Sequence, residues 1–287
     1  MKAKNSWYVD KKTAVIYVVL RILVIAVMIL QFFHGNYNNV FLCILTLILF
    51  MIPTVVDTKL NIKLPSALEI IILLFIFAAE ILGEIQSFYT FIPNWDTMLH
   101  TINGFLMAAI GFSMIDILNR SPRFHISMSP MFVAFVAFCF SMTVGVIWEF
   151  FEYSMDSIFL TDMQKDWLVS AVSSVKLNEE GINTPVIIKN ITETVINGTV
   201  NGEPVSFKVE GGYLDIGIID TMKDLIVNCI GAVAFSVLGV FYLKNREKGS
   251  VAEKFIPQMK TEEEIIHTKE MINELKKRRR HRKNKKH

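Results

Sequence analysis

The chain has 287 residues, of which 52% are hydrophobic, and its mean hydropathy is +0.43. This composition excludes an ordinary soluble domain and is typical of a polytopic membrane protein. The net charge of +2 hides an uneven distribution. Residues 244–287 carry 15 basic and 7 acidic residues, whereas residues 1–243 carry 14 basic and 20 acidic ones. Cys43, Cys139 and Cys229 all lie in apolar runs, so we interpret them as small core residues and not as disulfide or metal partners.

Hydrophobic runs predict an all-α polytopic membrane protein with six transmembrane helices. The runs cover roughly residues 13–33, 39–56, 66–84, 96–118, 131–154 and 217–243. The first run lacks the small-residue cleavage pattern of a signal peptide, so we interpret it as a retained span. Pro53 is expected to bend the second span, and Pro65 to stand at or just before the first turn of the third.

The basic residues of the connections predict the orientation in the membrane. Lys or Arg occur before the first span, between spans two and three, between spans four and five, and after span six, but not in connections 34–38 and 85–95. Both termini are therefore predicted to be cytoplasmic. The chain is expected to divide into helices one to five (1–156), an extracytoplasmic β-rich insert (157–216), helix six (217–243) and a basic cytoplasmic tail (244–287).

The insert and the tail each carry a structural signature. Three β-rich stretches and two Asn-Gly turn signals, Asn197-Gly198 and Asn201-Gly202, predict a small antiparallel sheet that could bind an outer protein partner. In the tail, Thr261 and Glu264 form a capping box for an amphipathic helix that ends in nine basic residues between 276 and 286. Those charges either only fix the topology or contact anionic lipid headgroups, and the lack of interleaved aromatic residues argues against nucleic acid.

Polar residues at the predicted outer ends of spans three to six are the most informative feature. An acid at the centre of a membrane helix costs about 2.5–3.5 kcal/mol to insert. Many of these residues nevertheless share a helix face at a spacing of three or four: Glu80 with Glu84, Asp96 with His100, Glu149 with Glu152, Glu152 with Asp156, Asp220 with Asp224, and Asp224 with Asn228. So many acids cannot all stay ionised in a low dielectric. They must hold a metal ion, share protons or be partly open to water.

Carboxylates with one imidazole suit Mg²⁺, Mn²⁺, Fe²⁺ or Zn²⁺ as a cofactor. The candidate metal ligands are His100, Glu149, Glu152, Asp220 and Asp224, with Glu149 or Glu152 as the catalytic general base. Secondary candidates are Asp96, Glu80, Asn103, Asp156 and Asn228. Simpler explanations compete: Asp96 and Asp215 suit helix N-caps, Glu84 an interfacial position, and Trp95, Trp148 and Tyr153 an aromatic belt.

Three motifs in order resemble the YjdF-like family of bacterial inner-membrane proteins. They are Asp96-x-x-x-His100-x-x-x-Gly104, Glu149-x-x-Glu152 between aromatic residues, and Asp220-Thr-x-Lys-Asp224 followed by small residues. The embedded His, acids and Asn-x-x-Gly are more distantly similar to VanZ-like proteins, which are associated with tolerance to glycopeptide antibiotics. The resemblance covers about residues 66–243 and implies a role in the cell envelope without a defined reaction. Ile219 departs from the pattern, which has Trp there, and so does the β-rich insert.

Three functions remain open from the sequence. The first is a metal-dependent hydrolase or transferase that acts on a lipid-linked phosphate or glycan at the outer leaflet. The second is a non-enzymatic envelope scaffold in which the acids hold a structural ion. The third is a proton- or cation-coupled transporter, against which stand the clustering of polar residues at one end and the lack of an internal repeat.

Overall fold

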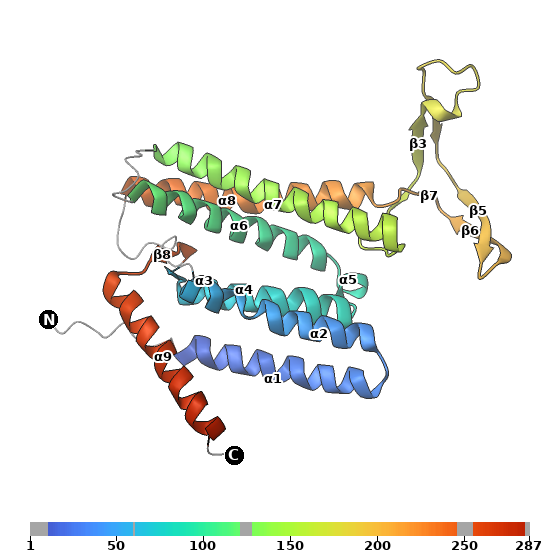
Figure 1. Ribbon diagram of the computed structural model, residues 1–287. Helices are drawn as coiled ribbons and strands as arrows, with labels where there is room; N and C mark the ends of the chain where they lie inside the picture. The colour runs from blue at the N-terminus through green and yellow to red at the C-terminus, as the bar shows by residue number, and fades with distance from the viewer. Residues whose placement is uncertain (1–10, 60, 121–127, 246–254, 285–287) are drawn as a thin grey trace. The chain divides into compact units, whose positions relative to one another are not determined.

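The computed structural model describes residues 11–59, 61–120, 128–245 and 255–284 and is 68% helical (Figure 1). Within these residues, six helical segments are long and apolar enough to cross a membrane, as the sequence predicts. They are formed by α1 (Lys11–Phe33), α2 with α3 (Tyr37–Leu49 and Ile52–Lys59), α4 with the π-helix η1 (Ser66–Phe77 and Ala78–Ile85), α6 (Trp95–Arg120), α7 (Pro130–Phe159) and α8 (Ile218–Asn245). A short helix, α5 (Phe88–Phe91), precedes α6.

Both prolines act as predicted. α2 ends at Leu49 and α3 starts at Ile52, which fits the loss of the hydrogen bond that Pro53, lacking an N–H, would have donated to the residue four positions earlier. Pro65 is the N-cap of α4 and brings the chain into the helix in an extended conformation. α7 extends five residues past the expected end of span five, so Asp156 lies in its last two turns and not beyond it.

The chain forms two compact units, residues 1–144 with 227–287, and residues 145–226. The first unit contains two separate hydrophobic cores. One is built on α1, α2 and α4 around Val24, Cys43 and Leu73, all fully buried. The other is built on α6, α7 and α8, with Phe112 and Phe235 at its centre. Many large apolar side chains elsewhere on the helices are exposed, which suits a surface that faces lipid.

The tail docks onto the first unit in a way that the sequence does not reveal. Strand β8 (Gln258–Met259) pairs antiparallel with β1 (Ile62–Lys63), which joins α3 to α4. Just before β8, Ile256 is buried in the core of α6, α7 and α8, and the ring of Phe255 lies 5.3 Å from that of Phe105. The tail segment therefore contacts the α1–α4 half through β8 and the α6–α8 half through Phe255 and Ile256.

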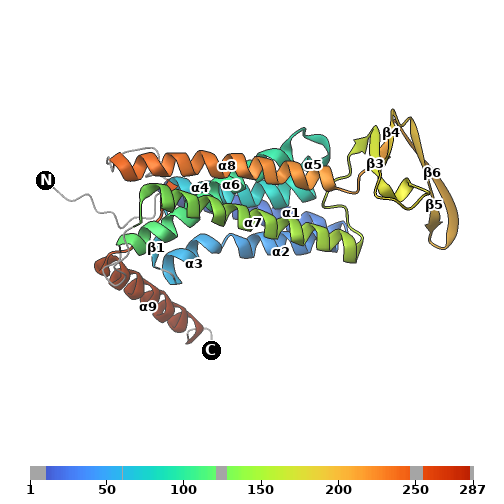
Figure 2. The same cartoon turned by 90° about the horizontal axis from the view of Figure 1, so that it is seen from above.

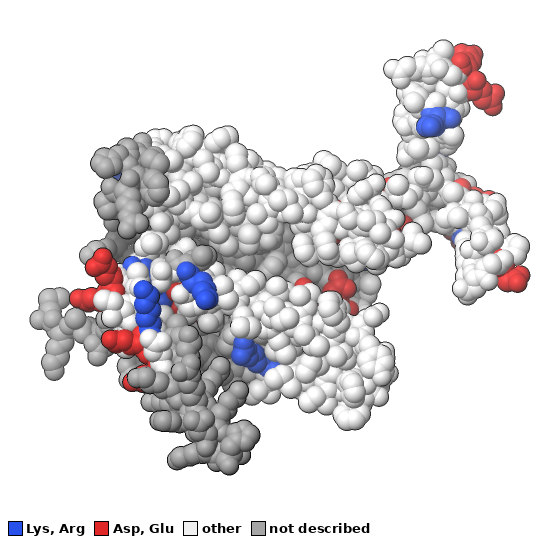
Figure 3. Space-filling view, viewed as in Figure 1, with Lys and Arg blue, Asp and Glu red and all other residues white. Residues whose placement is uncertain are grey.

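Two ion pairs hold the same segment. Lys260 Nζ lies 2.7 Å from Asp57 Oδ2, and Lys63 Nζ lies 2.9 Å from Glu264 Oε1. The predicted capping box is present at the start of α9 (Glu262–Asn284): the N–H of Thr261 donates to Glu264, and the N–H of Glu264 donates to the Thr261 hydroxyl. Both basic and acidic side chains gather at this end of the first unit (Figure 3). The side chains of the basic run 276–286 lie outside the described residues, so the expected amphipathic face of α9 stays a prediction.

The insert is β-rich as predicted, but it forms three separate two-stranded antiparallel ladders and not one sheet. They pair β2 (Leu168–Val169) with β7 (Tyr213–Leu214), β3 (Ala171–Ser174) with β4 (Val186–Lys189), and β5 (Glu193–Val200) with β6 (Glu203–Glu210). Asn201-Gly202 makes the predicted hairpin turn, with φ of 53° and 86°. The turn predicted at Asn197-Gly198 is wrong, because these residues lie inside β5, where a single turn at 201–202 allows both strands to reach eight residues.

The Lys260–Asp57 pair gives a first prediction. The Lys260 side chain is only 7% exposed, whereas that of Asp57 is 41% exposed. Replacing Lys260 by Ala should therefore lower the free energy of unfolding by about 1–2 kcal/mol, between the values for surface and buried pairs. Thermal unfolding of detergent-solubilised K260A, D57A and the double variant measures the coupling. Additive effects of the two single changes would show that the pair contributes nothing.

Candidate functional site

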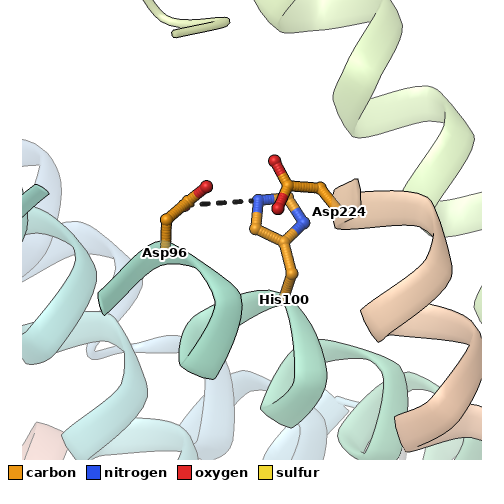
Figure 4. A group of neighbouring side chains, drawn as sticks. All are labelled: Asp96, His100 and Asp224. Carbon is orange, nitrogen blue, oxygen red and sulfur yellow. Dashed lines mark ion pairs between the residues drawn. The ribbon is translucent and has the colours of Figure 1, made fainter. Parts of the chain in front are cut away.

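One group of potential metal ligands stands out on α6 and α8. Asp96 lies in the first turn of α6, His100 lies one turn later on the same face, and Asp224 lies near the start of α8. One ligand atom from each lies within 4.8 Å of the other two, and His100 Nε2 lies 3.5 Å from Asp96 Oδ1 (Figure 4). His100 and Asp224 are buried, at 8% and 3% exposed, and Asp96 is half-buried. In the part of the chain that the structure describes, no other group of three such residues meets this criterion.

Close packing of α6 against α8 brings this group together. A Cβ atom on Gly104 would overlap the carbonyl oxygen of Asn228, and one on Gly231 would overlap that of Thr101, so the two backbones touch. Figures 1 and 2 show the two helices side by side. Small residues that let backbones approach are typical of helix pairs in membranes. α8 is unbroken, so Asp224 lies one turn before Asn228, just as His100 lies one turn before Gly104.

Polar side chains form a hydrogen-bond network at this contact, where the surrounding residues are mostly apolar. The amide of Asn228, which is fully buried, accepts a hydrogen bond from Asn103 Nδ2 at 3.1 Å and donates to the backbone oxygen of Ser141 at 3.4 Å. The hydroxyl of Ser141 donates to the backbone oxygen of Gly104 at 2.8 Å. Helices α6, α7 and α8 are thereby linked by side-chain hydrogen bonds. Asn103 and Asn228 are among the predicted secondary site residues, whereas Ser141 is not, because in the sequence it resembles any other serine in an apolar run.

Glu149 and Glu152 are both buried on α7, at 4% and 8% exposed. Glu152 Oε1 accepts a hydrogen bond from the indole N–H of Trp148 at 2.9 Å, so this tryptophan has a partner on its own helix as well as an exposed ring. Neither glutamate belongs to the Asp96, His100 and Asp224 group. Their burial fits a functional carboxylate, and their assignment as ligands stays a prediction.

Asp156, Asp220 and Asp215 hold the insert in place at its junctions with α7 and α8. Asp156 accepts hydrogen bonds from the Thr161 hydroxyl and from the N–H groups of Met163 and Gln164. Asp220 Oδ2 accepts from the Lys165 N–H at 2.8 Å, and its Oδ1 from the Trp167 indole at 3.4 Å. These carboxylates satisfy backbone donors at the junctions of the insert with α7 and α8. Asp220, expected as a metal ligand, lies outside the ligand group and serves this junction.

Asp215 has the capping role that the sequence suggested as an alternative to metal binding. Its carboxylate accepts from the N–H groups of Ile219, Gly217 and Trp167, the first two at the start of α8. Burial acts to raise the pKa of Asp215, but these backbone donors outweigh it and hold the pKa below its ordinary value. The Lys223 ammonium lies 3.3 Å from the centre of the Trp167 ring, a cation–π contact that further fastens this junction.

Glu80 and Asp116 are two further acids of the first unit that lie half-buried or buried in the spans. Glu80 is half-buried in the π-helix η1, a form often found at functional sites, whereas Glu84 is exposed, as an interfacial residue would be. Asp116 is 4% exposed on α6 and is not among the predicted site residues, although an acid inside a span is itself a signal.

The ligand group fits a divalent cation in charge and in number. Two carboxylates and a neutral imidazole carry a charge of −2, which one divalent ion would neutralise in a low-dielectric setting. Ligand atoms bound at about 2.0–2.2 Å lie roughly 3–4 Å apart, close to the separations here. Three protein ligands also leave room for a water or a substrate atom, as in catalytic sites, whereas structural sites usually have four.

The Asp215 cap gives a second prediction. A carboxylate with a lowered pKa stabilises the fold above its ordinary pKa of about 3.9, and this contribution is lost as the pH falls through the lowered value. D215A should destabilise the insert junction by about 0.5–2 kcal/mol at pH 7. The difference in unfolding free energy between D215A and wild type should shrink below about pH 4. Fluorescence of Trp167, with the other three tryptophans changed to Phe, reports the transition, and E179A is the control for an exposed acid. A difference that is independent of pH would contradict the assignment.

A family model described as "Predicted membrane protein (DUF2238)" matches residues 16–245, which include most of the first span, the other five spans, the ligand group and the insert. Neither the curated proteins nor the solved structures contain a significant match. The YjdF-like resemblance is consistent with this model, whereas a link to VanZ-like proteins is not shown. The chain thus belongs to the DUF2238 family of predicted membrane proteins, an assignment in agreement with its six apolar helices.

Proposed function

We propose that this integral membrane protein is a metal-dependent hydrolase or transferase of the cell envelope, with a divalent cation held by Asp96, His100 and Asp224. The observation that carries the proposal is a buried His/carboxylate group in which three potential ligand atoms lie within 4.8 Å of one another. A catalytic ion held by three protein ligands keeps a position for water, and the ion would make that water a nucleophile at neutral pH.

Glu149 and Glu152 are the candidates for the general base. Both carboxylates are buried on α7, and Glu152 Oε1 accepts a hydrogen bond from the Trp148 indole N–H at 2.9 Å. A positioned carboxylate can take a proton from a metal-bound water. Glu149 is the more deeply buried of the two, at 4% exposed against 8%, and is our first choice for the base, while Glu152 would orient or bind the substrate.

The substrate class follows from the position of the group in the membrane. Asp96 lies at the start of α6 and Asp224 near the start of α8, and both starts are on the outer side in the topology that the basic connections predict. Both termini would then be cytoplasmic and residues 157–216 extracytoplasmic, in a bacterial inner membrane. A site at that depth is accessible to the headgroup of a lipid in the outer leaflet, which makes a lipid-linked phosphate or glycan the natural substrate.

Two surfaces outside the site are proposed to have partners. The basic end of the tail, residues 276–286, would contact anionic lipid headgroups on the cytoplasmic side, at about 1 kcal/mol per basic residue near the surface. The insert exposes apolar residues on its hairpins, including Ile187, Ile196 and Phe207, which suit an outer protein partner.

Metal content of the purified protein is the third prediction. Wild type should retain about one divalent ion per chain. H100A and D224N should bind the ion more than about 100-fold more weakly, a larger loss than changes of residues that only orient the ligands usually cause. D220N is the matched control: it removes a carboxylate one turn away on the same helix and should keep the ion. Elemental analysis and competition with a chelating dye measure both quantities.

Activity separates the enzyme from its alternatives. With an isoprenyl pyrophosphate in micelles as the probe, phosphate release by wild type should fall by about 10²–10⁴-fold in E149Q, while its metal content stays unchanged. No metal in wild type would overturn the proposal. Bound metal without turnover would favour an envelope scaffold with a structural ion, and ion flux in proteoliposomes that depends on Glu152 or Asp224 would favour a transporter.

A further inference from the structure

Asn228 is placed where it can control the distance between the two helices that carry the ligand group. Its side chain is fully buried in the membrane-spanning part of α8. The amide oxygen faces Asn103 on α6 and the amide nitrogen faces the backbone of α7 at Ser141. Burying an amide in an apolar environment is costly unless both of its ends are hydrogen-bonded, and here both are.

The hydrogen bonds of Asn228 coincide with the closest approach of the helices. Gly104 lies against the backbone of Asn228, and Gly231, three residues further on, lies against the backbone of α6 at Thr101 and Phe105. The glycines let the helices touch but do not determine their rotation, since a backbone contact alone permits rolling. The Asn103–Asn228 bond adds a directional constraint, because hydrogen bonds weaken steeply when they are misaligned.

The ligand residues lie one helical turn from this contact on both helices. His100 precedes Gly104 by four residues and Asp224 precedes Asn228 by four, so each ligand shares a face with its contact residue. A rotation or separation of α6 and α8 at the contact would therefore change the distance between the His100 imidazole and the Asp224 carboxylate by nearly the same amount. Metal sites need ligand positions within about 0.5 Å.

We infer that Asn228 is a positioning residue: through its bond to Asn103 it sets the spacing and rotation of α6 and α8 so that His100 and Asp224 can bind one cation. This inference rests on the proposed metal site. A space-filling role alone would be met by leucine, which has the same side-chain branching and number of heavy atoms as asparagine and costs less to bury.

Substitutions along the same helix pair test it. N228L keeps the branching of the side chain and removes its hydrogen bonds to Asn103, Ser141 and Met142, and G231A forces the backbones apart at the contact. G239A is the matched control. Its Cβ would lie 2.5 Å from the Phe112 ring, so it strains the same pair of helices two turns further from the ligands. N103L, at a half-buried position, removes the Asn103–Asn228 bond alone and serves if N228L does not fold.

The measurements are Mn²⁺ and Zn²⁺ affinity by competition, and thermal unfolding in the same detergent. N228L, N103L and G231A should weaken metal binding by about 10–100-fold, the range for outer-shell partners. G239A should lower the unfolding temperature yet leave affinity within about twofold of wild type, since it does not move the ligands. Either of two results would overturn this inference but not the proposed function. One is metal affinity that falls in parallel with the unfolding temperature across all four variants. The other is metal affinity that is unchanged in N228L and N103L. Absence of metal from wild type would overturn the proposed function and this inference together.

Discussion

The contact between α6 and α8 is the constraint on which the ligand group depends. Gly104 and Gly231 allow the two backbones to touch, and the bond between Asn103 and Asn228 fixes how they face each other. Ser141 links α7 to the same point. In lipid there is no hydrophobic force to hold helices together, so close packing and buried polar bonds must do so. One turn away, the same arrangement holds an imidazole and carboxylates at a separation suited to a cation.

The acids of the chain fall into groups with different structural roles. Asp156, Asp215 and Asp220 accept hydrogen bonds from backbone N–H groups and attach the insert to the ends of α7 and α8. Asp57 and Glu264 pair with lysines and attach the tail to the α1–α4 half. Asp96 and Asp224 gather with His100 in the one described group that resembles a metal site. Acids that look alike in the sequence thus differ in the donors that the fold supplies to each.

How far the sequence predicts this protein depends on the range of the interaction. Spans, the break near Pro53, the cap at Thr261 and the hairpin at Asn201-Gly202 follow from local chemistry and were predictable. Pairing of β1 with β8 and the Asp57–Lys260 bridge join residues about 200 positions apart, and burial of Ile256 joins the tail to α6, α7 and α8. No local sequence pattern predicts these contacts. From the sequence, a helix cap explains Asp96 as well as metal binding does, so spacing alone makes it a secondary candidate. Spacing also predicts Asp220 as a ligand, because it shows which residues share a face but not which backbone donors face them.

Pulsed electron paramagnetic resonance of the protein loaded with Mn²⁺ tests the central claim most directly, because it counts the nitrogen ligands of the ion. The account predicts one bound Mn²⁺ per chain, coupled to a single imidazole nitrogen, and loss of that coupling in H100A. It also predicts that D220N leaves the spectrum unchanged. An ion without nitrogen coupling in wild type, or a coupling that survives in H100A, would contradict the assignment of Asp96, His100 and Asp224 as the metal site.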